Sequence, residues 1–188
     1  MDRSSLKEFT KQDWDTLFPL ELVDHDPEWK NIFKTEKEIL LKAAGPFIER
    51  IEHFGSSSIP GIKSKPYIDI LVELPQELEV YTSFVQALEE TGYTCLTGIE
   101  PKAGIVLVKG YFPDGTTDQV FHLHACSKGN PMLQQLRFRD YLRVNSARAK
   151  DYEALKLSLL TSFRNDRSGY RIAKTQFITR TLEMATAR

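Results

Sequence analysis

The chain has few cysteines and lacks a long apolar run. Only Cys95 and Cys126 occur among 188 residues, too few for a disulfide framework and without the paired spacing of a zinc site, so we expect two buried, reduced thiols. No segment approaches the roughly 18 uninterrupted apolar residues of a transmembrane helix. The N-terminal residues are interrupted by charge and do not resemble a signal peptide. We therefore expect a cytoplasmic protein with no membrane partner.

The chain also lacks a strong net charge of either sign. Its formal net charge is -1 and its sequence pI is about 6.4. A nearly neutral surface has no general basic field to attract long nucleic acid or an anionic membrane. The content of 41% hydrophobic and 27% charged residues is typical of a globular protein, and 188 residues suffice for one compact domain. Any phosphate must therefore be recognised locally, and no protein partner is indicated.

Apolar periodicity and turn residues divide the chain into an N-terminal arm, 1–23, and a single domain, 24–188. The patterns predict, in order, a helix that begins at Asp26 and Pro27 and stops at Gly45 and Pro46, strands at 47–54 and 67–74, a helix at 77–91, strands at 93–97, 105–112 and 119–126, and three helices that begin near Asn130, Asn145 and Ser168. This order predicts an α+β fold with a mixed β-sheet flanked by helices and a helical C-terminal layer.

The strand at 67–74 carries carboxylates on one face. Residues two apart share a face, so Tyr67, Asp69, Leu71 and Glu73 point to one side and an apolar set points to the other. An ionised carboxylate among apolar groups is costly unless it is paired. A metal, a nearby lysine or a serine hydroxyl could each pair with Asp69.

Two histidines share a face of the strand at 119–126. His122 and His124 are separated by one residue, which places both imidazoles on the same side of the strand. This spacing can serve a metal or a phosphate. The alternative is that each histidine is a partly buried residue satisfied by its neighbours.

A loop of small residues precedes the first of these strands. Gly55, Ser56, Ser57 and Ser58, followed by Lys65, offer backbone N–H groups, hydroxyls and an ammonium group, which suit a triphosphate. The spacing does not match a Walker A loop. Taken alone, such a stretch can equally be a simple turn.

The residues from His53 to Ile62, with the sequence HFGSSSIPGI, together with KPYIDI at 65–70, resemble the signature of GrpB-like proteins of the nucleotidyltransferase-fold superfamily. The resemblance extends over about 23–178 and implies a nucleotidyltransferase-like sheet. It also implies metal chemistry, with carboxylates that hold Mg²⁺ or Mn²⁺ and a loop, here Gly55, Ser56 and Ser57, that grips NTP phosphates.

The chain departs from the superfamily pattern at one metal ligand. Position 71 is leucine, where the pattern has a second carboxylate, and Glu73 lies one strand step further on, roughly 6.6 to 6.8 Å away. The strand of the third carboxylate offers His122 and His124. The candidate metal ligands are therefore Asp69, Glu73, His122 and His124, a set that suits Mn²⁺, Zn²⁺ or no metal better than Mg²⁺.

Basic residues recur in the C-terminal helical region. Arg139, Lys156 and Lys174 are candidates for a basic wall that faces the sheet and binds phosphate. Lys156 and Lys174 each follow a tyrosine at i,i+4, which could present a phenol and an ammonium to one cleft. The alternative for each charge is an ordinary surface pair.

The sequence supports three functional hypotheses. The first is transfer of a nucleoside monophosphate from an NTP, with Asp69, His122 and His124 as catalytic residues and Lys65 neutralising charge. The second is a module that binds a nucleotide, a coenzyme or another phosphorylated small molecule without chemistry, which Leu71 favours. The third is metal-dependent hydrolysis by Asp69 and the two histidines.

Overall fold

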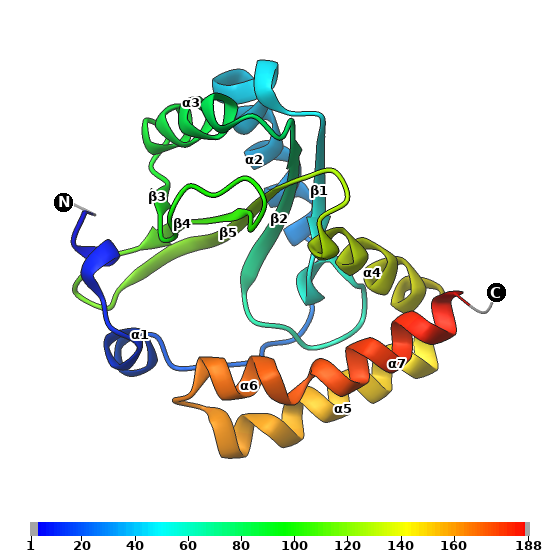
Figure 1. Ribbon diagram of the computed structural model, residues 1–188. Coiled ribbons are helices and arrows are strands. Elements are labelled where there is room, and N and C mark those ends of the chain that lie inside the picture. Colours follow the sequence, from blue (N-terminus) through cyan, green and yellow to red (C-terminus); the bar gives the residue numbers. More distant parts are fainter. Residues whose placement is uncertain (1–3, 187–188) are drawn as a thin grey trace.

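A five-stranded mixed sheet forms the centre of the protein (Figure 1). The computed structural model describes residues 4–186. The strand order is β1-β2-β5-β4-β3, in which β2 and β5 pair in parallel and every other pair is antiparallel. The strands are β1 (Arg50–Phe54), β2 (Tyr67–Leu74), β3 (Thr94–Cys95), β4 (Ile105–Tyr111) and β5 (Thr117–Ser127). The predicted α+β fold with a mixed sheet is confirmed.

Two helices, α2 (Trp29–Ala44) and α3 (Leu78–Glu89), cover one face of the sheet. Ile68, Ile70 and Val72 of β2 are completely buried there against Leu40 of α2 and Phe84 of α3. These alternate residues of β2 are the apolar set expected from the period of two. The main core therefore lies on this side and leaves the Asp69 side of the sheet available for a site.

The C-terminal helices lie on the opposite side of the sheet (Figure 1). They are α4 (Gln134–Val144), α5 (Ser146–Phe163), α6 (Arg167–Ala173) and α7 (Thr175–Thr186). The prediction of three helices was wrong, because the last one is divided at Lys174. No helix within residues 4–186 combines the length and apolarity needed to cross a membrane.

Several predicted helix and strand starts are displaced along the chain. Helix α2 begins at Trp29, after a turn in which the Asp26 carboxylate accepts a hydrogen bond from the Glu28 N–H (2.9 Å). Strand β1 begins at Arg50, because residues 45–47 form a 3₁₀ turn. Asp166 caps α6 by accepting from the Gly169 N–H (2.9 Å), so the expected cap at Ser168 was wrong.

The N-terminal arm packs on the sheet face opposite α2 and α3, near the start of β2 and the end of β4. Within its described part, a 3₁₀ turn (Ser4–Glu8) precedes α1 (Lys11–Leu17), and Leu6 and Phe18 are buried against Tyr67 and Tyr111. Arg167 of α6 forms two hydrogen bonds with the arm. Its backbone N–H donates to Asp15 (3.0 Å) and its guanidinium donates to the Phe18 carbonyl (2.6 Å). Residues 1–3 of the expected arm and 187–188 of the expected domain lie outside the described residues.

A bulge at Gly110 determines which way Tyr111 faces. The β4–β5 register shifts between Lys109 and Tyr111, and Gly110 has a φ of 92°. A Cβ at this glycine would lie 2.3 Å from the Gln119 carbonyl oxygen. Across this shift β4 advances two residues, from Lys109 to Tyr111, while β5 advances four, from Phe121 to Thr117. The side-chain alternation of β4 is reversed at this irregularity, so Lys109 bonds to Glu36 on the core side while Tyr111 faces the opposite side.

We predict that Gly110→Ala lowers the free energy of unfolding by roughly 1–3 kcal/mol, because alanine is strained at positive φ and its Cβ would meet the Gln119 backbone. Urea unfolding of the variant and of the unchanged protein measures the difference. Gly98→Ala is the matched control: Gly98 is not in the positive-φ region and has space for a Cβ, so this variant should be neutral or more stable by roughly 0.4–1 kcal/mol. Equal stability of Gly110→Ala and the unchanged protein would contradict the prediction.

Candidate functional site

A cleft of about 520 Å³ lies between the open face of the sheet and helices α5 to α7. It is lined by polar and charged groups from β2, β5, the loop before β2 and the C-terminal helices. The structure brings together in this cleft Gly55, Ser56, Lys65, Asp69, His122, His124, Lys156 and Lys174, all of which were named from the sequence. The cleft is thus the candidate site.

The loop after β1 is pressed against Asp69. Phe54 is paired with Asp69 across β1 and β2, and Gly55 turns the chain there with a φ of 66°. A Cβ at Gly55 would lie 2.1 Å from the Asp69 carboxylate. Only glycine therefore allows the loop backbone to approach the carboxylate so closely.

Asp69 lies beside His122 in the parallel β2–β5 register. The His122 Nδ1 is 4.0 Å from the nearer carboxylate oxygen, and both side chains are about one-fifth exposed, at 18% and 21%. Burial raises the pKa of Asp69, while the positive charges of Lys65 and Lys174 act in the opposite direction. Asp69 is therefore a carboxylate set among cations.

Three lysines of the cleft lie in surroundings that oppose their charge. Burial lowers the pKa of Lys65 to about 7, that of Lys156 to about 7 and that of Lys174 to about 8. Lys174 contributes to lowering the pKa of both other lysines, whereas Asp69 raises that of Lys65 and of Lys174. Lys156 is only 2% exposed, and its ammonium donates to the Lys63 carbonyl. The three ammonium groups thus lack enough negative charge in the protein to balance them.

Two arginines of α6 join this group, and the sequence analysis did not identify them. Arg167 and Arg171 line the cleft with Lys174. The three residues are spaced i, i+4 and i+7, so they share one face of a helical segment, and that spacing was the available signal. The expected helix start at Ser168 left Arg167 outside the helix, and Arg171 was overlooked because only Lys174 and its spacing from Tyr170 were considered.

A hydrogen-bonded chain orients His122. The Arg167 guanidinium donates to the Tyr111 hydroxyl oxygen (3.2 Å), and that hydroxyl lies 2.7 Å from His122 Nε2. Arginine can only donate, and of the two other groups bonded to this hydroxyl, Tyr67 and His122, the imidazole Nε2 is the stronger acceptor, so it takes the Tyr111 proton. Burial holds the pKa of His122 well below its usual value, so the ring is neutral. The arrangement favours the tautomer with its proton on Nδ1, facing Asp69, which makes His122 a hydrogen-bond donor there.

Two buried polar atoms of the cleft have no hydrogen-bonding partner among the described residues. They are His124 Nδ1 and the Tyr170 hydroxyl. Burial and the positive charges of Lys65 and Arg171 lower the pKa of His124 to about 4. Buried polar groups in folded proteins are almost always paired, so these atoms are available to a ligand or to ordered water.

Three predicted site residues do not line the cleft. Ser57 points away from it and its hydroxyl is 3.1 Å from His53 Nε2, because the 3₁₀ turn at 56–58 sends successive side chains in different directions. Arg139 donates to Glu52 (2.9 Å), on the other side of that loop. Glu73 lies near the end of β2 opposite Arg50, one strand step beyond Leu71.

The described residues do not fit a divalent metal. No group of three histidines, cysteines, aspartates or glutamates within residues 4–186 is arranged to hold one. Leu71 is completely buried against Phe54 and Leu136 at the position of the second carboxylate. Lys65 and Lys174 act on Asp69 as positive charges and would repel a cation. The lining of the cleft therefore has more cationic groups than carboxylates.

Comparison with known proteins shows similarity along nearly the whole chain. The GrpB protein family matches residues 19–184. The glutamate-rich protein GrpB of Alkalihalophilus pseudofirmus is 35% identical over 159 residues, which are 84% of this chain and 90% of that protein. The UPF0157 protein YqkA of Bacillus subtilis is 34% identical over 161 residues, and the chain spans only 45% of YqkA. The crystal structure of conserved protein GrpB from Enterococcus faecalis has a TM-score of 0.74 at 29% identity, covering 88% of this chain and 96% of that one.

We predict that His122 is a neutral imidazole with its proton on Nδ1, and that Tyr111→Phe abolishes this preference by removing the proton donor to Nε2. Two-bond ¹⁵N–¹H correlation spectra of the histidine rings report the tautomer. Tyr93→Phe is the control, because the Tyr93 hydroxyl bonds to Glu36 on the core side of the sheet (3.0 Å). An Nε2-protonated His122 in the unchanged protein would be inconsistent with the assignment.

Proposed function

The chain belongs to the GrpB family, and we propose that its cleft binds the phosphate group of a nucleotide or of another phosphorylated small molecule without a metal ion. The observation that carries this proposal is the convergence of Lys65, Lys156, Lys174, Arg167 and Arg171 around a single carboxylate. Like charges held together in partly buried positions destabilise one another. A bound phosphate would supply the negative charge that these cations lack.

Neutral groups of the cleft complement the cations. Ser56 lines the cleft beside Asp69, and the backbone of the glycine-containing loop is not screened by a side chain at Gly55. His124 Nδ1 and the Tyr170 hydroxyl offer two further positions for hydrogen bonds. A volume of about 520 Å³ falls in the range of small-molecule and cofactor sites. A nucleotide-sized ligand would therefore fit both the space and the chemistry.

A second candidate function is transfer of a nucleoside monophosphate from an NTP. The contact between Gly55 and Asp69 favours it, because the resemblance pairs such a loop with a carboxylate on the next strand. Lys65 would then stabilise negative charge on the reacting phosphates. Leu71 in place of a second carboxylate weighs against it. Release of pyrophosphate from ATP, GTP, CTP or UTP would establish transfer over simple binding.

Titration calorimetry with each of these four nucleotides, with and without Mg²⁺ or Mn²⁺, tests the proposal. We expect binding that does not require the metal, and we expect Asp69→Asn to retain or strengthen it at pH 6, because the substitution removes a negative charge from the anion site. Asp118→Asn, at an exposed position outside the cleft, makes the same change in net charge. It should leave binding unchanged.

The opposite result would contradict the proposal that the cleft binds phosphate without a metal. If binding appears only with Mg²⁺ or Mn²⁺ and disappears in Asp69→Asn but not in Asp118→Asn, Asp69 holds a metal and the transfer hypothesis replaces this one. If none of the nucleotides binds, titration with inorganic phosphate and with pyrophosphate shows whether the cleft has any affinity for phosphate.

We also predict that binding is coupled to proton uptake. In the free protein the pKa of Lys65 and Lys156 is about 7, and a bound anion favours the charged ammonium, so it raises those pKa values. The affinity contributed by these lysines is therefore fully present below pH 7 and declines as the pH rises through 7 and 8. Lysine Cε-labelled NMR titrations with and without ATP measure the shift, with exposed Lys34 as the internal reference. Unchanged Lys65 and Lys156 titrations on saturation with ATP would contradict the prediction.

A further inference from the structure

A second cavity, of about 700 Å³, lies on the other side of the loop that contacts Asp69. It lies between α2 and α4 and shares no lining residue with the cleft. The 3₁₀ turn after Gly55 separates the two: Ser56 lines the cleft, whereas Ser57 and Ser58 line the second cavity. Nothing in the proposed function of the cleft accounts for this cavity.

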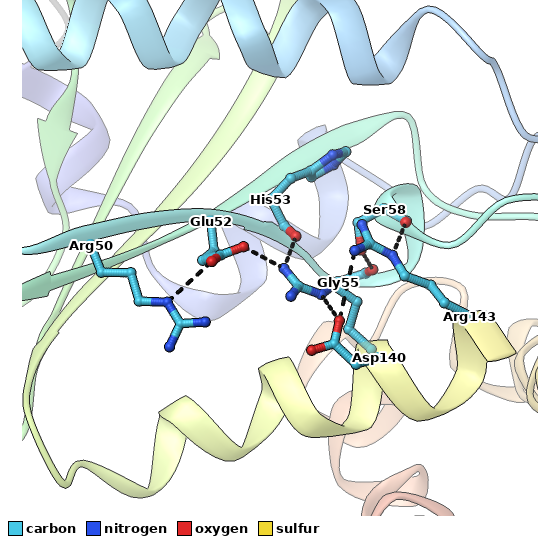
Figure 2. Close-up of polar contacts among 8 residues, drawn as sticks. Arg50, Glu52, His53, Gly55, Ser58, Asp140 and Arg143 are labelled. Atoms are coloured by element: carbon cyan, nitrogen blue, oxygen red, sulfur yellow. Dashed lines mark hydrogen bonds and ion pairs between the residues drawn. The ribbon is translucent and has the colours of Figure 1, made fainter.

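Two arginines of α4, Arg139 and Arg143, line the second cavity. Figure 2 shows Arg143 on α4 beside Ser58 and Asp140. Arg139 is 6% exposed and makes three hydrogen bonds, to Glu52 (2.9 Å), to the His53 carbonyl (2.7 Å) and to Asp140 (2.8 Å). It therefore acts as a fixed charge that holds α4 against β1.

Arg143 has hydrogen-bonding capacity left over. Its Nε donates to the Ser58 carbonyl (2.9 Å), and its Nη1 is 3.7 Å from an Asp140 oxygen that also accepts from Arg139. Among the described residues, neither terminal nitrogen of Arg143 lies within hydrogen-bonding distance of an acceptor. Planar guanidinium groups of this kind bind carboxylate and phosphate oxygens in pairs.

Two histidines complete the polar lining. His25 Nδ1 is buried without a partner among the described residues. His53 Nε2 is 3.1 Å from the Ser57 hydroxyl, and its ring stacks on Phe33 with centroids 4.9 Å apart. Burial lowers the pKa of His25 and brings that of His53 to about 3, so both rings are neutral. They can therefore donate hydrogen bonds to a ligand and add no charge.

The charges of the cavity also favour an anion. Lys30, Arg139 and Arg143 line it against the single carboxylate of Glu52, which is already bonded to Arg139 and Arg50. We propose that this cavity is a second binding site, for a small molecule that carries an oxyanion group, phosphate or carboxylate, held by Arg143, Lys30 and His25. The site is independent of the ligand of the cleft.

The distribution of histidines gives a direct test. The chain has 4 histidines, of which His25 and His53 line the second cavity and His122 and His124 line the cleft. We would titrate ¹⁵N-histidine-labelled protein with sodium phosphate, with sodium acetate, and with sodium chloride at matched ionic strength. Saturable shifts of His25 and His53 with phosphate or acetate, but not with chloride, are expected. Shifts confined to His122 and His124 would support the cleft and overturn the second site.

Variants identify the groups that bind. Arg143→Gln should weaken the His25 and His53 response by about 10-fold to 150-fold, in line with about 1.5–3 kcal/mol for a hydrogen bond to a charged group. Lys30 is exposed, so Lys30→Gln should weaken the response by only about 3-fold to 10-fold. Lys34→Gln is the matched control for Lys30, because Lys34 is exposed one turn further along α2 and does not line the cavity. Arg180→Gln, exposed on α7, is the control for Arg143.

These variants also separate binding from folding. Lys30 has an exposed side chain, so Lys30→Gln should leave the thermal stability of the protein unchanged even if Arg143→Gln loosens the loop at Ser58. Equal affinities in Lys30→Gln, Lys34→Gln and the unchanged protein would overturn the assignment of Lys30, and equal affinities in Arg143→Gln would overturn the site. The absence of any saturable shift at His25 and His53 would overturn it as well.

Discussion

The parallel pairing of β2 with β5 determines which side chains lie together on the polar face of the sheet. It sets Asp69 directly opposite His122 and Leu71 opposite His124, so one carboxylate and two imidazoles share one face of the sheet. On the other face the same strands supply the apolar core. Because the side-chain period of a strand is two, a slip of one residue would bury Asp69 in that core. The register is therefore set by hydrophobic burial, and the position of the polar face follows from it.

Arg167 connects three parts of the structure that are distant in sequence. It bonds to the arm through Asp15 and Phe18, to the sheet through Tyr111, and it lines the cleft from α6. The contact with Tyr111 depends on the bulge at Gly110, which turns the phenol to the cleft side. The arm, the bulge and the C-terminal helices therefore act together on the orientation of His122, although none of them supplies a group to the β2–β5 pair itself.

The loop after β1 contributes residues to two cavities, one on each of its sides. Its glycine backbone presses on Asp69, its first serine faces the cleft, and its next two serines face the second cavity. Both cavities have an excess of cationic groups, and each contains at least one buried nitrogen, His124 Nδ1 or His25 Nδ1, without a partner among the described residues. A loop only a few residues long thus separates two cavities with cationic linings, each with two of the chain's 4 histidines.

The strands were predicted more accurately than the C-terminal helices, and the reason is physical. Alternation placed β2 and β4 within a residue of their observed bounds and put Asp69 with the two histidines on the polar face. The C-terminal helices were less well predicted, because the signals at Ser168 and at Asp166 are both acceptable caps and only packing selects between them. Arg167 was missed as a consequence of that error, whereas Arg171 lay within the expected helix and was overlooked.

The sequence by itself determined the α+β order and the polar faces of β2 and β5. These are local properties, since they follow from the periodicity of strands and helices. Only the tertiary structure decided that Ser57 and Arg139 belong to a different cavity from Asp69, that glycine is needed where the loop meets Asp69, and that lysines surround this carboxylate. Those facts depend on how a short turn and the C-terminal helices pack against the sheet, which involves contacts such as that between Lys63 and Lys156, 93 positions apart.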